Sequence, residues 1–213
     1  MSDPLAAAAT PRAAWYFRKR FSLFGAVYGV AIFFGYFFAG VAGLPLLPAF
    51  VTSGHPALFG ALAIGLTAAG WILRVWASSY LAGAVVWTQD VTGGDLRIAG
   101  PYRFTRNPLY LGNLLQAIGI GLAFPWTVVV LLAVLMLAYC LVLIHVEERF
   151  LAREHGERYA RYRASVARLI PLPWKVAPDS GQRGSLREGL RSELMTAGFT
   201  VMVVVLVVLR WPR

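Results

Sequence analysis

Residues 111–146 read LGNLLQAIGIGLAFPWTVVVLLAVLMLAYCLVLIHV and decide the fold, because these 36 residues contain no Asp, Glu, Lys or Arg. A membrane-spanning helix needs only about 20 apolar residues, so the stretch is long enough to cross a bilayer twice. Pro125 and Trp126 lie near its middle. We therefore expect a helical hairpin, with one span reaching about Phe124 and the next ending near Val146. A single kinked helix is the alternative, but it would be far longer than a bilayer requires.

The composition of the whole chain also favours a membrane protein. Of its 213 residues, 58% are hydrophobic and only 14% are charged, which is too apolar for a soluble domain of this length. Outside the hairpin, further apolar runs predict spans at residues 21–43, 57–86 and 194–209. We therefore predict one all-α integral membrane domain over residues 1–213, with about five transmembrane helices.

The charges of the chain predict its orientation. The formal net charge is +10 and comes almost entirely from arginine. In the five-span arrangement, the basic N-terminus, the loop with Arg97, Arg103 and Arg106, and the arginine-rich residues 147–168 all fall on one side, which the positive-inside rule makes cytoplasmic. Arg210 and Arg213 are a small exception. The arginine therefore reflects topology and anionic lipid rather than nucleic acid, and the composition favours a prokaryotic cytoplasmic membrane.

Several segments outside the spans carry their own expectations. Residues 147–168 should continue the last hairpin helix beyond the membrane and lie at its surface, with a break at Gly156. The apolar strip of that helix consists of Phe150, Leu151, Tyr159, Tyr162 and Val166. Residues 179–193 are rich in Gly, Ser and Arg and are expected to form a mobile linker.

Arg74 is a lone charge in the second span, so it should face the protein interior, a cavity or the headgroups.

Cysteine and histidine are scarce. Cys140 is the sole cysteine, so a disulfide within the chain is excluded, and no Cys/His set has the spacing of a zinc site. We therefore expect no metal centre.

The first polar motif of interest comes just before the hairpin, in residues 100–110, GPYRFTRNPLY. Proline disfavours helix for the residue before it, so Asn107 should cap a helix that has Pro108 at its first position. The free backbone N–H groups of that helix end, flanked by Arg103 and Arg106, would attract a carboxylate or a phosphate. The alternative interpretation is a well-capped helix with arginines at the membrane interface.

The second motif is His145, Glu147 and Glu148 at the other end of the hairpin. Adjacent helix residues point about 100° apart, so one carboxylate could bind a cation while the other pairs with an arginine such as Arg103, Arg106 or Arg149. The alternative is that the pair marks where the helix leaves the bilayer. The hairpin should bring both motifs to the same membrane depth. An anion site beside a cation site suits a zwitterion.

Together, GPYRFTRNPLYLG at residues 100–112 and EERFLAREHGERYARYRASVARLIP at residues 147–171 resemble the isoprenylcysteine carboxyl methyltransferase and phospholipid methyltransferase superfamily. The resemblance covers residues 94–171. It implies a catalytic core there, preceded by two spans in residues 1–93 and followed by a linker and C-terminal span in residues 172–213.

The resemblance implies S-adenosylmethionine as the methyl donor and a lipophilic acceptor in the membrane, namely an isoprenylcysteine-type carboxylate, a lipid amine or a small thiol. The cofactor-binding residues that we expect are Gly100, Pro101, Tyr102, Arg103, Arg106, Asn107, Pro108, Tyr110, His145, Glu147 and Glu148. Asn107 replaces the family's histidine and cannot act as a base near neutral pH. No catalytic base is therefore assigned.

The acceptor and the reaction class have alternatives at this stage. Val142, Leu143 and Ile144 occupy the place where isoprenylcysteine enzymes carry an arginine, which argues against a prenylcysteine carboxylate. A sterol-reductase-like NADPH oxidoreductase would need about ten spans of ~20 residues, more than this chain can form. A non-catalytic membrane scaffold and a transporter are the remaining alternatives. The oligomeric state is open.

Overall fold

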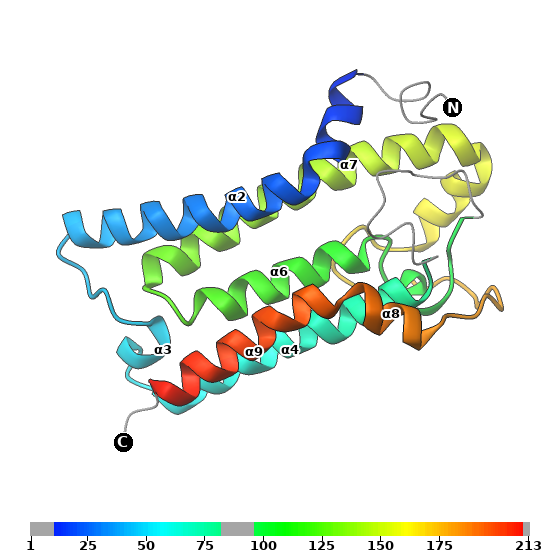
Figure 1. Cartoon of the computed structure of the whole chain (residues 1–213). Coiled ribbons are helices and arrows are strands. Elements are labelled where there is room, and N and C mark those ends of the chain that lie inside the picture. Colours follow the sequence, from blue (N-terminus) through cyan, green and yellow to red (C-terminus); the bar gives the residue numbers. More distant parts are fainter. Residues whose placement is uncertain (1–10, 82–95, 211–213) are drawn as a thin grey trace. The chain divides into compact units, whose positions relative to one another are not determined.

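The computed structural model describes residues 11–81 and 96–210, and every regular element in these residues is helical (Figure 1). In chain order the elements are α2 (Pro11–Val41), α3 (Ala49–Thr52), α4 (Pro56–Ser79), the 3-10 helix η1 (Gly100–Arg103), α6 (Pro108–Gly121), α7 (Trp126–Ser165), α8 (Leu186–Ser192) and α9 (Leu194–Leu209). The all-α prediction is confirmed.

Three helices among the described residues are long and apolar enough to cross a membrane: Ser22–Val41 of α2, the whole of α4, and α7. A fourth candidate arises if the bent pair α8 and α9 counts as one span. Helix α6 has 14 residues, so at 1.5 Å per residue it is about 21 Å long, shorter than a ~30 Å hydrocarbon core. The structure thus supports the predicted integral membrane protein, with three or four candidate spans among the described residues where the sequence predicted about five.

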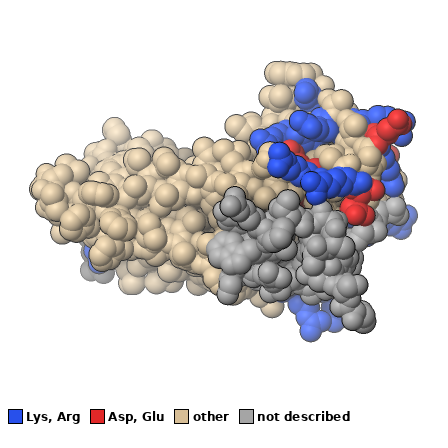
Figure 2. Space-filling model, turned by 90° about the horizontal axis from the view of Figure 1, so that it is seen from above, with Lys and Arg blue, Asp and Glu red and all other residues tan. Residues whose placement is uncertain are grey.

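The chain forms two compact units, each assembled from three segments. One, which we call the polar unit, contains Met1–Phe21, Leu73–Leu111 and Cys140–Glu193. The other, the apolar unit, contains Ser22–Ile72, Gly112–Tyr139 and Leu194–Arg213, and its only charged residues are Arg210 and Arg213. Figure 2 shows the consequence on one face, where the charged side chains gather in one region and a broad surface carries almost none.

Small residues let the helices of the apolar unit approach closely. A Cβ atom on Gly70 of α4 would lie 2.6 Å from the carbonyl oxygen of Gly112 in α6, so only glycine fits there. Thr127 of α7 donates a 2.7 Å hydrogen bond to the carbonyl of Gly35 in α2. Close helix contacts and hydroxyl–carbonyl bonds of this kind hold membrane helices together where lipid provides no hydrophobic drive.

The predicted hairpin is confirmed, since α6 ends at Gly121 and α7 begins at Trp126. The loop between α2 and α4, which contains Pro45 and Pro48, does more than connect two candidate spans. Its short helix α3 was not predicted, and there the backbone N–H of Ala49 bonds to the carbonyl of Phe124 at 2.7 Å while Phe50 is fully buried. The loop therefore packs on the hairpin turn within the apolar unit.

Helix α4 is shorter than the predicted span 57–86, because it ends at Ser79. The carbonyl of Ser79 accepts a 2.7 Å hydrogen bond from the backbone N–H of Ser185, a partner that local sequence could not reveal. Residues 82–95, with the predicted Gly93–Gly94 turn, lie outside the described part of the chain.

Helix α7 continues past Glu148 as predicted and breaks at Gly156, whose φ of 46° and ψ of −122° are non-helical. Its apolar strip is a core face of the polar unit and not a membrane-facing one. Tyr159, Tyr162 and Val166 pack with Leu96 and Ala177.

The predicted mobile linker at residues 179–193 is also corrected, because it contains α8 and bonds to its surroundings. Ser185 caps α8 by accepting a hydrogen bond from the N–H of Glu188. The side-chain oxygen of Gln182 accepts one from the N–H of Ile98 at 3.0 Å. Arg74 has its partner here: its guanidinium binds the fully buried carboxylate of Glu193 at 2.8 Å. Of the three placements that the sequence left open for Arg74, the structure shows the protein interior.

Candidate functional site

The site that the motifs predict lies entirely in the polar unit, where α6 begins. Helix α6 starts at Pro108 as expected, and the carbonyl of Asn107 accepts the first helical hydrogen bond, from the N–H of Leu111. The side chain of Asn107 is buried and points across to α7 and the segment after it. Its amide donates to the carbonyl of Arg168 at 2.8 Å and to Glu148 Oε1 at 3.3 Å.

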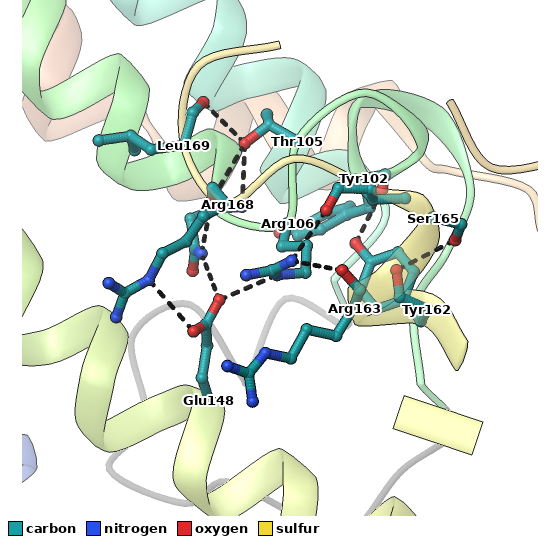
Figure 3. A network of polar contacts seen from close by, with 11 residues as sticks. Tyr102, Thr105, Arg106, Glu148, Tyr162, Arg163, Ser165, Arg168 and Leu169 are labelled. Atoms are coloured by element: carbon teal, nitrogen blue, oxygen red, sulfur yellow. Dashed lines mark hydrogen bonds and ion pairs between the residues drawn. The ribbon is translucent and has the colours of Figure 1, made fainter. Parts of the chain in front are cut away.

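Glu148 is the centre of a charged network (Figure 3). Its Oε1 accepts a hydrogen bond from Arg106 Nε at 2.9 Å, and its Oε2 lies 3.2 Å from Arg168 Nε. With the amide of Asn107, three donors surround this one carboxylate. Hydrogen bonds of this kind to an ionised acceptor are roughly twice as strong as neutral ones, so Glu148 ties the start of α6 to α7.

Arg106 has further partners in the chain after Glu148. Besides Glu148, its Nη1 donates to the carbonyls of Arg163 and Val166, both at 2.8 Å. These carbonyls lie at the C-terminal end of α7, where the helix offers them no backbone partners. The side chain is 8% exposed. Its charge is balanced within the protein, so its geometry suits holding the motif together better than attracting an anion.

Glu147 takes a different partner, as expected for adjacent residues on a helix. Its Oε2 accepts a hydrogen bond from the hydroxyl of Tyr110 at 2.9 Å. The hydroxyl thus links α6 to α7 one helical turn after Asn107. The two predicted motifs are therefore brought together by direct contacts between Arg106 or Asn107 and Glu148, and between Tyr110 and Glu147.

Arg103 points to the segment after α7. Its Nε donates to the carbonyl of Ala177 at 3.0 Å, its Nη1 lies 3.6 Å from the carboxylate of Asp179, and the guanidinium lies 5.8 Å from the centre of the Phe104 ring. The neighbouring Thr105 donates to the carbonyl of Leu169 at 2.8 Å. The loop from η1 to α6 is thus fastened to the chain that follows α7.

Tyr102 is buried in η1 beside this network. Burial raises the pKa of its hydroxyl well above the usual value of 10.0, and the charge of Glu147 raises it further. Its backbone carbonyl accepts a 2.7 Å hydrogen bond from the hydroxyl of Tyr162. At neutral pH Tyr102 is therefore uncharged and cannot act as a base.

The other residues predicted to bind the cofactor include two in η1 and one on the exposed surface of α7. Gly100 has a φ of 58° and Tyr80 packs against it, so a side chain there would be strained and would clash. Pro101 is buried in η1, whereas His145 is exposed on α7 and takes no part in the network formed by the described residues. Sequence reasoning did not assign Arg168 and Thr105 to the site, although both occur in the two motifs.

Comparison with known proteins finds a family match over the part of the chain that contains these motifs. The family model for phospholipid methyltransferases matches residues 58–158, which run from α4 into the part of α7 beyond Glu148. The cobalt-zinc-cadmium resistance protein CzcN of Cupriavidus metallidurans is 33% identical over a match that covers 58% of this chain and 56% of that protein. The chain thus matches about half the length of this relative.

No solved structure matches the chain. The matched residues 58–158 include the whole of the first motif and both glutamates of the second. The family match therefore confirms, for this part of the chain, the predicted resemblance to the superfamily of membrane methyltransferases that includes the phospholipid methyltransferases.

Proposed function

We propose that the protein is an S-adenosylmethionine-dependent methyltransferase that modifies a lipophilic acceptor in the membrane, with its cofactor site facing the cytoplasm. The observation that carries the proposal is the joining of the two motifs in the polar unit. Arg106 and Asn107 bond to Glu148, and Tyr110 bonds to Glu147. The match to a methyltransferase family supports it.

The residues present fit the amino-acid part of such a donor, which carries an ammonium and a carboxylate. The carboxylate of Glu147, which accepts a hydrogen bond from Tyr110, suits the ammonium. The first-turn N–H groups of α6 suit the carboxylate. Tyr159 is 1% exposed and its hydroxyl has no hydrogen-bond partner among the described residues, so it offers one further buried polar group.

When bound, the donor would supply a methyl group on a cationic sulfur. The residues of this chain would position the reactants and keep water away from them, which can lower a barrier substantially without acid–base chemistry. Asn107 cannot accept a proton near neutral pH, and Tyr102 is held protonated. The acceptor should therefore be a group that is nucleophilic without help from these two residues, such as a thiol, an amine or a carboxylate.

The candidate spans around the site support a lipophilic acceptor. Described residues of α4 and α7 belong to candidate membrane spans, so an acceptor dissolved in lipid could reach the protein laterally.

The name of the relative CzcN refers to metal resistance. In residues 11–81 and 96–210 there is no group of three or more His, Cys, Asp or Glu side chains that could hold a metal ion.

Calorimetry on the detergent-purified protein tests the proposal. S-adenosylmethionine and its demethylated product should bind, NADPH should not, and Glu147→Gln should weaken binding at least tenfold, about 1.4 kcal/mol. Arg161→Gln, at an exposed position of α7, is the matched control and should bind normally. Binding of NADPH instead would favour a reductase, and binding of none of these ligands would favour a scaffold. Either result would refute the proposal.

A further inference from the structure

Helix α8 has one face packed against the protein and another face left open. On the packed side, Gly189 lies so close to Val75 and Ser79 that an added Cβ atom would be 2.5 Å from the carbonyl of Val75. Ser192 is buried beside it, and Glu193 pairs with Arg74. These contacts fix α8 on the last turn of α4, within the polar unit.

That location places α8 at a membrane boundary. Helix α4 is a candidate span that ends at Ser79. The last turn of a spanning helix lies near the headgroup layer, because the apolar run ends there. The polar residues Ser78 and Ser79 mark this end, and Ser78 donates to the carboxylate of Glu193 at 2.7 Å. A helix held against this turn is therefore at the depth of the lipid headgroups.

The open side of α8 is amphipathic. Leu186 and Leu190 are four residues apart and thus lie on one side of the helix, with 64% and 39% of their surfaces exposed. Arg187 and Arg191 follow each leucine by one position, about 100° further round, and both are exposed. In the described part of the chain, Leu186 is therefore mostly uncovered and Leu190 partly uncovered.

The acidic residues near α8 do not cancel this basic side. Glu193 is buried with Arg74, and Asp179 lies next to Arg103. Glu188 is exposed and lies three positions before Arg191, about 60° away on the helix, so it can offset one of these positive charges but not all of them. Arg183, just before the helix, adds another exposed positive charge.

We propose that α8 is an anchor for anionic phospholipid, with Leu186 and Leu190 at the acyl boundary and Arg183, Arg187 and Arg191 on the headgroups. Apolar side chains beside basic ones at interface depth are the pattern of helices that lie in a membrane surface. Each exposed arginine near an anionic leaflet contributes about a fivefold preference for it. The inference does not depend on the methyltransferase proposal, because none of these residues touches that site.

A site-specific probe tests the anchor. Leu190→Cys and, as the matched control, Glu188→Cys are labelled with an environment-sensitive fluorophore. The unmodified protein is the labelling blank, since Cys140 is fully buried. Each labelled variant is placed in nanodiscs made of phosphatidylcholine alone or of phosphatidylcholine mixed with phosphatidylglycerol. We expect the Leu190 probe to shift to the blue and to be quenched by lipids spin-labelled near the headgroup when phosphatidylglycerol is present, while the Glu188 probe stays in water.

Arg183→Gln, Arg187→Gln and Arg191→Gln together should remove the difference between the two lipid compositions, with the melting temperature in detergent unchanged. A Leu190 probe exposed to water in both nanodiscs would overturn the proposal. Equal insertion in phosphatidylcholine alone would overturn the role of the arginines. A probe already buried in detergent, with cross-links between copies, would mean that another protein surface covers α8 and would overturn it as well.

Discussion

Arg106 donates a 2.9 Å hydrogen bond to Glu148 across 42 residues of sequence, and neither side chain is more than 13% exposed. The bond joins the residue two positions before α6 to the point where α7 leaves its apolar run. Because Glu147 bonds instead to Tyr110, we infer different roles for the two adjacent glutamates. Glu148 stabilises the junction, and Glu147 is the carboxylate proposed to meet the cofactor.

Glu148→Gln should therefore lower stability more than Glu147→Gln. Loss of the charge leaves Arg106 and Arg168 without their anion, and removing one partner of a poorly exposed charged pair costs roughly 2–4 kcal/mol. Glu147→Gln retains an oxygen that can accept from Tyr110, so its free energy of unfolding should fall by less than that of Glu148→Gln. Chemical denaturation in detergent measures both. Equal losses would refute the division of roles.

Asn107→Asp should destabilise the protein in a pH-dependent way. The variant loses an N–H donor and sets a second carboxylate beside Glu148, which raises the pKa of the new aspartate. A raised pKa in the folded state means that stability is lost as the pH rises through that pKa. The deficit relative to the unmodified protein should thus be larger at pH 8 than at pH 5 in thermal melts. A deficit independent of pH would show that Glu148 is not charged next to this position.

Tyr102→Phe should reduce the alkaline sensitivity of the protein. Burial raises the pKa of Tyr102 well above 10.0, so the folded state keeps the proton that the unfolded chain loses near pH 10. Stability must then fall as the pH rises above about 10. Without the hydroxyl, the fall in melting temperature between pH 9 and pH 11 should be smaller. An identical fall would show that Tyr102 is accessible to solvent in the folded protein.

Much of the site could be predicted because its signals are local. An Asn-Pro step predicts where α6 begins, and a proline near the middle of 36 apolar residues predicts a hairpin. Once the hairpin is inferred, Asn107 and Glu148 must lie at the same depth. Helix α9 could likewise be read from its apolar run, and its bounds, Leu194–Leu209, agree with the prediction.

Other features escaped prediction because their partners are distant or their pattern is ambiguous. Arg74 and Glu193 are 119 residues apart, and no local periodicity links them. The bond between Ser185 and the carbonyl of Ser79 uses backbone groups, which every residue has, so a segment rich in Gly and Ser resembled a linker. The apolar side chains around Tyr159 in α7 have the same helical spacing whether they face a membrane or a protein core, so the sequence alone does not distinguish the two.

The buried pair of Arg74 and Glu193 should behave as a unit. Glu193 has no exposed surface, and Ser78 and two nitrogens of Arg74 bond to it. Arg74→Met leaves a buried carboxylate without its cation, which should cost about 3–5 kcal/mol. Arg74→Met combined with Glu193→Leu should recover most of that loss, because the double variant buries no charge. A double variant as unstable as the sum of the single variants would contradict the pairing.

Gly156→Ala should destabilise the protein through backbone conformation alone. Gly156 breaks α7 with a φ of 46°, and an added Cβ atom there would meet nothing within 4 Å. A residue with a side chain is strained in this region by about 1–3 kcal/mol. Gly65 of α4 also has open space around it but no positive φ, so Gly65→Ala is the matched control and should be neutral or stabilise by up to ~1 kcal/mol. Because the break directs Tyr159 and Tyr162 into the core of the polar unit, Gly156→Ala should also weaken cofactor binding. If both alanine variants melt alike, α7 is continuous at this position in solution.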